Sequence, residues 1–186
     1  LVGNLVIQNC DADTNAFIAA FDKTTGDEVW RTDREDARGW STPILIKAAG
    51  RDELVMNGHH GLTAYDPTTG LPLWFCKGFV GRGTPTVTPA RDLLHVVSGL
   101  RGDTYAVRPG GNGDVTSTHM AWHTPRNCSR DLPSPIVLGD QSLVMDMRRA
   151  TITAYNIKTG EETWRDRLGD AAVLGQFCAT PVAWNN

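Results

Sequence analysis

The stretch "LTAYDPTTGLPLW", residues 62–74, contains the pattern that decides the fold. A small residue, Ala64, precedes an aromatic one, the segment DPTTG follows, and the stretch closes on Trp74. An aspartate can hydrogen-bond to the backbone two residues further on and so start a turn. Gly70 supplies the positive φ that a tight hairpin turn needs. The stretch therefore predicts a β-hairpin that brings a tryptophan beside a small residue.

The same pattern recurs along the chain. It returns as "AAFDKTTGDEVW" at 19–30 and as "TAYNIKTGEETW" at 153–164. A degenerate copy, "YAVRPGGNGDVTSTHMAW" at 105–122, has Arg108 in place of the aspartate and a longer turn. The repeated positions are Ala20, Gly26, Trp30, Ala64, Gly70, Trp74, Ala106, Trp122, Ala154, Gly160 and Trp164. Successive tryptophans are 44, 48 and 42 residues apart, and a near-constant period of this kind indicates a repeat protein.

A second marker keeps the same phase as the tryptophans. Ser/Thr-Pro pairs open a short apolar run in each unit, at 42–43, 84–85, 134–135 and 180–181. Alternating apolar residues between turn-forming residues predict four short strands per unit, and no helix of ten or more residues is expected. In the second unit the strands are expected at 43–48, 53–57, 62–66 and 71–75. Four strands in roughly 40–45 residues are typical of a propeller blade.

We therefore expect an all-β fold, a β-propeller of four-stranded antiparallel blades with about four blade equivalents. The repeated tryptophans are interpreted as structural contacts between neighbouring blades and not as ligand platforms. The expected units are a partial blade at 1–37, a blade at 38–79, a blade with an enlarged turn at 80–130, a blade at 131–172 and a lone innermost strand at 173–186.

Composition excludes several classes of protein. The net charge of −3 gives no general electrostatic basis for nucleic-acid binding. No apolar run approaches the ~20 residues of a membrane-spanning helix. The chain begins at Leu1 with neither a methionine nor a signal sequence, so we expect it to be a processed or truncated piece of a longer protein.

The repeated residues closely resemble the tryptophan-docking motif of the pyrroloquinoline-quinone-like (quinoprotein) β-propeller repeats. Some members of that family are alcohol or glucose dehydrogenases that hold the quinone and a calcium ion on the propeller axis. Others are non-catalytic, such as the lipoprotein subunit of the outer-membrane β-barrel assembly machinery. The resemblance implies a periplasmic or extracellular location. It also implies a ring of seven or eight blades, of which this chain would supply about half.

Three arrangements complete such a ring. The chain can be a fragment of a longer propeller, or it can pair with a second copy to close an eight-bladed ring. Alternatively, its last strand can complete the first blade and give a four-bladed ring.

Two sets of loops are expected to share one face of the propeller, where members of the family that are enzymes build their site. The candidate ligand or partner residues on this face are Trp40, His59, His60, Arg82, Arg101, Arg148 and Arg149. The alternative interpretation is that these loop charges are simply solvated. Adjacent histidines on an extended segment point in opposite directions and rarely hold one ion together.

No catalytic, cofactor-binding or metal-binding residue is predicted. The chain lacks the adjacent cysteine pair of many dehydrogenases of the family and any haem attachment motif, and its carboxylates show no calcium-binding pattern. Its four cysteines are Cys10, Cys76, Cys128 and Cys178; a disulfide between Cys128 and Cys178 is a hypothesis.

The preferred functional prediction is a non-catalytic protein-binding or scaffold module that carries no cofactor. Its partner would be another protein, the remaining blades or a second copy of the chain. The alternative is part of a quinone- and calcium-dependent alcohol or sugar dehydrogenase. A third hypothesis, carbohydrate binding, depends on Trp40 alone.

Overall fold

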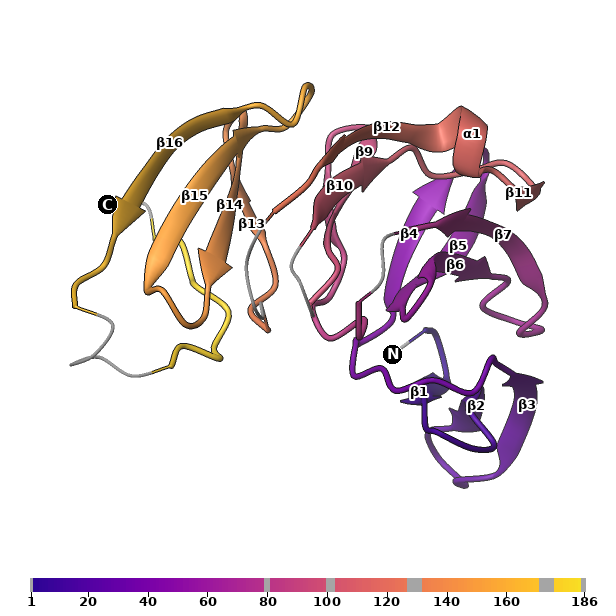
Figure 1. Ribbon diagram of the computed structural model, residues 1–186. Helices are drawn as coiled ribbons and strands as arrows, with labels where there is room; N and C mark the ends of the chain where they lie inside the picture. Colours follow the sequence, from indigo (N-terminus) through magenta and orange to yellow (C-terminus); the bar gives the residue numbers. More distant parts are fainter. Residues whose placement is uncertain (1, 79–80, 100–102, 127–131, 171–175, 185–186) are drawn as a thin grey trace.

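The computed structural model describes residues 2–78, 81–99, 103–126, 132–170 and 176–184. Within these ranges the chain is all-β apart from one four-residue helix, α1 (Thr116–His119). The strands form four sheets that follow one another around an open arc, with the first and last sheets at its two ends (Figure 1). The predicted propeller fold of antiparallel blades is confirmed. No helix in the described ranges is long and apolar enough to cross a membrane.

Each sheet is built from strands that are consecutive in the chain, apart from one added strand. The first sheet consists of β1 (Leu5–Cys10), β2 (Phe17–Asp22) and β3 (Glu28–Asp33). The second consists of β4 (Ile44–Ala48), β5 (Arg51–Gly58), β6 (Gly61–Tyr65), β7 (Pro72–Lys77) and the added β11 (Gly113–Asp114). The third consists of β8 (Thr88–Ala90), β9 (Leu93–Val97), β10 (Thr104–Val107) and β12 (Met120–Thr124). The fourth consists of β13 (Ile136–Leu138), β14 (Gln141–Asp146), β15 (Thr151–Asn156) and β16 (Glu162–Arg167).

The repeated motif forms the hairpin between the third and fourth strands of each blade. Ala64 of β6 lies directly opposite Trp74 of β7, and a bulge follows at once. The turn begins at Asp66, whose Oδ1 accepts hydrogen bonds from the backbone N–H groups of Thr68 and Thr69, at 2.8 and 3.0 Å. Gly70 closes it at φ +73°. The alanine leaves room for the indole, and the bulge turns the tryptophan towards the next sheet.

The enlarged turn of the third unit contains more structure than the sequence predicts. Residues 113–114 form β11, which pairs in parallel with Trp74 and Phe75 of the second sheet. The first residue of α1, Thr116, accepts a hydrogen bond from the backbone N–H of Lys77 through Oγ1 at 2.9 Å. The insertion therefore covers the outer edge of β7 and gives the second sheet a fifth strand. A covered edge cannot pair with another chain.

The lone strand expected at 173–186 is not formed in the described residues 176–184. A strand requires a neighbour for its backbone groups, and β1 of the first sheet pairs with β2 and not with this segment. Within the described ranges the first sheet therefore receives no strand from the C-terminal segment, which the four-bladed ring would require. Thr180 nonetheless contacts the loop before β13, since its Oγ1 accepts a hydrogen bond from the backbone N–H of Ser134 at 3.1 Å.

His95 of β9 is a buried titratable group in the third sheet. Its side chain is 1% exposed, neither ring nitrogen bonds to a described residue, and its ring lies 5.7 Å from that of Trp122. Burial lowers the pKa of His95 from its ordinary value of 6.5 to about 4. The unfolded chain therefore takes up the proton more readily than the folded one as the pH falls through this range.

We expect His95 to make the fold sensitive to acid. The free energy of unfolding should decline as the pH falls from about 6.5 to about 4, and His95 should account for up to ~3 kcal/mol of that decline. Replacing it by a non-titrating side chain, His95→Leu, should remove that share of the decline. Urea unfolding at neutral pH and near pH 4 measures the difference for both chains. An equal loss in the two chains would show that His95 does not titrate in this way.

Candidate functional site

Trp30 and Trp122 each join their own sheet to the next one. The indole N–H of Trp30 donates to the backbone carbonyl of Pro67 at 3.2 Å, and that of Trp122 donates to Ile157 at 3.0 Å. Both acceptors lie in the third-to-fourth-strand turn of the following blade. The glycine of each turn lies against the ring, so that an added Cβ at Gly70 or Gly160 would overlap the indole.

Trp74 is bonded differently because the following blade carries the insertion. Its indole N–H donates to Oε2 of Glu53 at 2.8 Å within the same sheet. The same carboxylate oxygen accepts from the backbone N–H of Gly110 at 3.2 Å, and Arg51 pairs with the other oxygen at 2.9 Å. Glu53 is fully buried and Trp74 is 1% exposed. A buried carboxylate thus replaces the turn carbonyl that serves at the other two junctions.

Trp164 differs from the other three, since its side chain is 41% exposed. Its indole N–H donates to Oε1 of Gln141 in its own sheet at 3.2 Å. In the first sheet, an added Cβ at Gly26 would meet nothing within 4 Å. The docking contacts seen at Gly70 and Gly160 are therefore not repeated at these two positions in the described chain.

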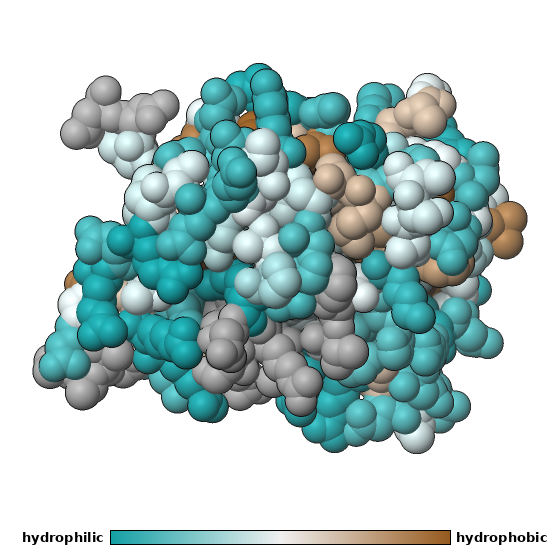
Figure 2. All heavy atoms as spheres, turned by 45° about the horizontal axis from the view of Figure 1, so that its top comes forward, coloured by the Kyte–Doolittle hydropathy of each residue, from teal (hydrophilic) through white to brown (hydrophobic). Residues whose placement is uncertain are grey.

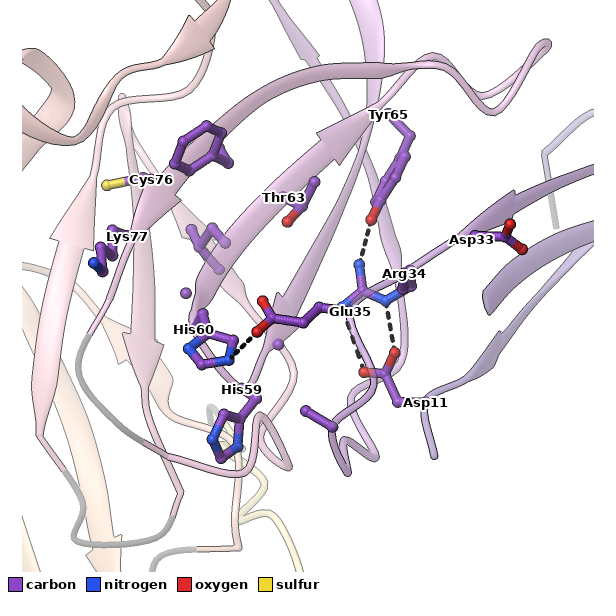
Figure 3. A pocket seen from close by; sticks show the side chains of 15 residues that line it. Asp11, Asp33, Arg34, Glu35, His59, His60, Thr63, Tyr65, Cys76 and Lys77 are labelled. Carbon is purple, nitrogen blue, oxygen red and sulfur yellow. Dashed lines mark hydrogen bonds and ion pairs between the residues drawn. The ribbon is translucent and has the colours of Figure 1, made fainter. Parts of the chain in front are cut away.

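A cavity of about 590 Å³ opens where the first and second sheets meet. Figure 3 shows its lining, to which the loops after β1 and β3, the β5–β6 hairpin and the end of β7 all contribute. The polar residues that matter for its chemistry are Asp11, Arg34, Glu35, His59, His60, Tyr65 and Lys77. These loops are the ones that the sequence places on a shared face.

Arg34 forms the buried floor of this cavity. Its Nε lies 2.6 Å from Oδ1 of Asp11, its Nη1 donates to the hydroxyl of Tyr65, and it lies between the two in Figure 3. The side chains of Arg34 and Asp11 are only 10% and 3% exposed. Burial acts to lower the pKa of Arg34, but Tyr65 and Asp11 outweigh it and raise that pKa above its ordinary value. The guanidinium is therefore a fixed cation that holds the two loops together.

The cavity rim carries a second, looser polar pair. Nε2 of His60 lies 3.1 Å from Oε1 of Glu35, and both side chains are largely exposed. The rings of His59 and His60 meet edge to face at a centroid distance of 4.6 Å. Nδ1 of His59 is buried without a hydrogen-bond partner in the described chain. The two histidines thus form a small aromatic and polar rim above the ion pair.

Trp40 and Arg82 extend this rim. The Trp40 side chain is 53% exposed, and the Arg82 guanidinium lies 5.9 Å from the centre of its ring. The backbone N–H of Trp40 donates to Gly83, and an added Cβ at Gly83 would come within 2.7 Å of Gly58, the residue before His59. Trp40, Arg82, His59 and His60 therefore surround one junction, and together we call them the rim residues.

Two other predicted face residues lie on a different sheet. Arg148 and Arg149 lie in the turn between β14 and β15 of the fourth sheet, where their backbone N–H groups donate to Asp146. Arg101 lies outside the described residues. Arg34, on the other hand, was not among the candidates predicted from the sequence. Arg34 could have been predicted from its position just after β3, which is at the same end of the first sheet as the β1–β2 loop.

The cavity offers few ligands for the calcium ion of the dehydrogenases. Calcium takes about six to eight oxygen ligands, yet nowhere in the described ranges do three His, Cys, Asp or Glu side chains gather to hold a metal. Two carboxylates of the lining are already engaged by cations, Asp11 by Arg34 and Glu35 by His60. Asp33 is the third carboxylate of the lining, and one carboxylate falls short of the roughly six to eight oxygen ligands that calcium takes.

The hypothesised disulfide would join Cys178 to a residue outside the described ranges. Cys178 is a free thiol, as are Cys10 and Cys76. Cys128 lies outside the described residues. The Sγ of Cys178 lies 3.8 Å from Sδ of Met147 in the loop after β14.

The fold is found in several solved structures. BamB from Moraxella catarrhalis matches with a TM-score of 0.67 and 21% identity, over 89% of this chain and 46% of that chain. The computationally designed protein Ika8 matches with a TM-score of 0.62 and 11% identity, over 89% and 47%. The quinohemoprotein alcohol dehydrogenase ADHIIG from Pseudomonas putida HK5 matches with a TM-score of 0.53 and 20% identity, over 74% of this chain and 22% of that chain. The chain thus spans about half the length of the first two structures.

Family membership is established by sequence. No curated protein matches the chain. A family model described as "Outer membrane protein assembly factor BamB" matches residues 14–186. Because that match covers almost the whole chain, the chain belongs to this family of quinoprotein-like β-propellers.

Proposed function

We propose that this chain is a non-catalytic protein-binding or scaffold module, which contacts its partner through the rim residues. The observation that carries the proposal is the exposed Trp40 with Arg82 against its ring, held through Gly83 against Gly58, which lines the cavity. Tryptophan and arginine are the side chains most enriched at the energetic centres of protein interfaces. The family description, an outer membrane protein assembly factor, supports a protein as the partner. It also supports the periplasmic or extracellular location that we propose.

The surface of the molecule suits a partner that binds by a few anchors. The face seen in Figure 2 is mainly hydrophilic, with hydrophobic side chains in small separate areas. Such a surface favours a peptide or loop that inserts one side chain into the cavity while Trp40 and Arg82 hold its flank. A peptide carrying both a carboxylate and an apolar side chain would match Arg82, Lys77 and Trp40.

Selection of displayed peptides on the immobilised chain tests the proposal. We expect peptides recovered on the wild-type chain to lose at least about tenfold in affinity for Trp40→Ala, because interface tryptophans cost about 2 kcal/mol or more when truncated. Leu71→Ala is the control, since Leu71 is 64% exposed and lies at the opposite end of β7 from the cavity. Peptides that bind the Trp40→Ala variant and the wild-type chain with equal affinity would show that the rim residues are not the binding site.

The alternative, a quinone- and calcium-dependent dehydrogenase, has its own test. Quinone and calcium are added to the purified chain with an alcohol and an electron-accepting dye. We expect no turnover, because two of the three carboxylates that line the cavity are held by Arg34 and His60. Saturable quinone binding with dye reduction would overturn the non-catalytic proposal.

A further inference from the structure

The first sheet covers only part of the face that the second sheet turns towards it. Tyr65 of β6 packs in the core shared by these two sheets. Thr63 is two residues before it and pairs with Phe75 of β7, so the side chains of Thr63 and Phe75 lie on this same face. Both residues line the cavity, and the Phe75 side chain is 43% exposed. An apolar ring is therefore left uncovered between two blades.

Lys77 adds a positive charge to the same face. It is two residues after Phe75 on β7, so the two side chains point to the same side, about 7 Å apart along the strand. Lys77 is exposed and lines the cavity. It forms no ion pair within the described ranges, although it interacts electrostatically with Asp114 of β11. The uncovered face thus offers an apolar position and a cationic position at a fixed spacing.

Glu35 reaches the cationic end of this face from the opposite wall of the cavity. It comes from the loop after β3, and Figure 3 shows its side chain extending to His60 of the β5–β6 hairpin. His60 lies beside Lys77, because Gly61 pairs with Lys77 and the backbone carbonyl of His60 accepts from Gly78 at 2.7 Å. A carboxylate of the chain itself therefore lies where an anionic group of a ligand would bind.

The contact between Glu35 and His60 is easily replaced. Their side chains are 73% and 49% exposed, and exposed ion pairs of this kind contribute little to stability. Arg34, the residue before Glu35, holds the loop independently through its buried pair with Asp11. An incoming carboxylate can therefore displace the Glu35 side chain without disturbing the loop that carries it.

We propose, on the basis of the protein-binding function above, that the cavity holds an extended segment of a partner protein in which an acidic and an apolar side chain are two residues apart. The acidic side chain replaces Glu35 beside His60 and Lys77, and the apolar side chain covers the ring of Phe75. In an extended segment such side chains lie on one side about 7 Å apart, which matches the spacing of Phe75 and Lys77. The cavity of about 590 Å³ is within the range of about 300–1,000 Å³ for ligand pockets.

Glu35 then acts as an internal competitor for the acidic side chain. It opposes binding because it has to leave His60 and because its negative charge repels the incoming carboxylate. Like charges brought together at an interface disfavour association. Removal of Glu35 should therefore strengthen binding, which is a result that damage to the fold would not produce.

Fluorescence anisotropy of labelled five-residue peptides tests the required spacing. Each peptide carries one phenylalanine and one glutamate among glycines and serines, either two residues apart or adjacent, in both orders. We expect the tighter of the two-apart peptides to bind at least about fivefold more tightly than the adjacent ones, and Phe75→Ser to weaken it by at least about fivefold. Leu71→Ser is the matched control, because it removes a more exposed apolar side chain next to the other end of β7.

The competing role of Glu35 is tested with the same peptide. We expect Glu35→Ala to tighten its binding by at least about threefold. Asp13→Ala is the matched control and should leave the affinity unchanged, since Asp13 is 59% exposed, has the same charge and pairs with Arg38 outside the cavity lining. Affinities that are indifferent to both the spacing and Glu35→Ala would overturn the proposal. So would the absence of binding to both the wild-type and the Glu35→Ala chains.

The same variants separate this inference from the proposed function. If peptides selected on the wild-type chain depend on Trp40 but not on Glu35 or Phe75, the rim residues bind protein and the assignment of the cavity is wrong. If the two-apart peptide depends on Glu35 and Phe75 but not on Trp40, the assignment of the cavity holds and the rim residues are not the site.

Discussion

We expect Trp74→Ala to lower the free energy of unfolding by about 3–5 kcal/mol, the range for a buried aromatic side chain. The indole is 1% exposed and packs in a core shared by the second and third sheets, with Val55, Val107 and Val115. Its removal also takes a hydrogen bond from Glu53, which is fully buried. A cavity and a less well satisfied carboxylate result from one substitution.

Two comparisons assign the loss to this site. Trp164→Ala makes the same chemical change at a repeat position that is 41% exposed, and we expect it to cost under about 1 kcal/mol. Trp74→Phe keeps most of the packing but removes the indole N–H. We expect it to lower the free energy of unfolding by about 1–3 kcal/mol, because the buried Glu53 carboxylate loses a hydrogen-bond donor. Urea unfolding of the monomeric chain measures all three. If the Trp74→Ala chain has the same free energy of unfolding as the Trp164→Ala chain, the packing described for the second junction is contradicted.

The hairpins could be predicted from the sequence because their determinants are local. The turn aspartate or asparagine, the glycine and the tryptophan lie within twelve residues of each other in each complete copy. The cross-strand partner of each tryptophan follows from the hairpin itself, since Ala64 faces Trp74 as Ala20 faces Trp30. A repeating local pattern thus determined the number, order and direction of the sheets.

The insertion could not be read in the same way. Residues 109–113, "PGGNG", have the composition of a turn, and nothing local predicts a strand or a helix. Residues 113–114 become a strand only because the outer edge of β7 offers them hydrogen-bonding groups. That edge belongs to another blade, so the structure of the insertion depends on packing and not on its own sequence.

The candidate site was predicted in part for a related reason. Topology placed Trp40, His59, His60 and Arg82 on one set of loops, and they do lie around one junction. The contact between Arg34 and Asp11 joins two loops that are 23 residues apart and depends on how each loop folds back. Charge type alone did not distinguish this buried arginine from the exposed Arg148 and Arg149.

We expect Arg34→Met to cost about 3–5 kcal/mol, because it leaves the carboxylate of Asp11 buried without its cation. Asp11 is 3% exposed at its side chain, and an added Cβ at Gly39 would overlap its carboxyl group. The carboxylate therefore has little room to turn towards water. The Tyr65 hydroxyl would also lose the donor that Arg34 provides.

The double variant Arg34→Met with Asp11→Asn tests the cause. It removes both charges at nearly constant volume, and replacing a whole buried pair is often close to neutral. We therefore expect it to recover most of the loss, which appears as a coupling energy in the double-mutant cycle. The exposed pair between Arg38 and Asp13 joins the same two loops, with side chains 56% and 59% exposed. Arg38→Met should cost under about 1 kcal/mol, so an equal cost for both arginines would show that the cavity floor is not held by a buried ion pair.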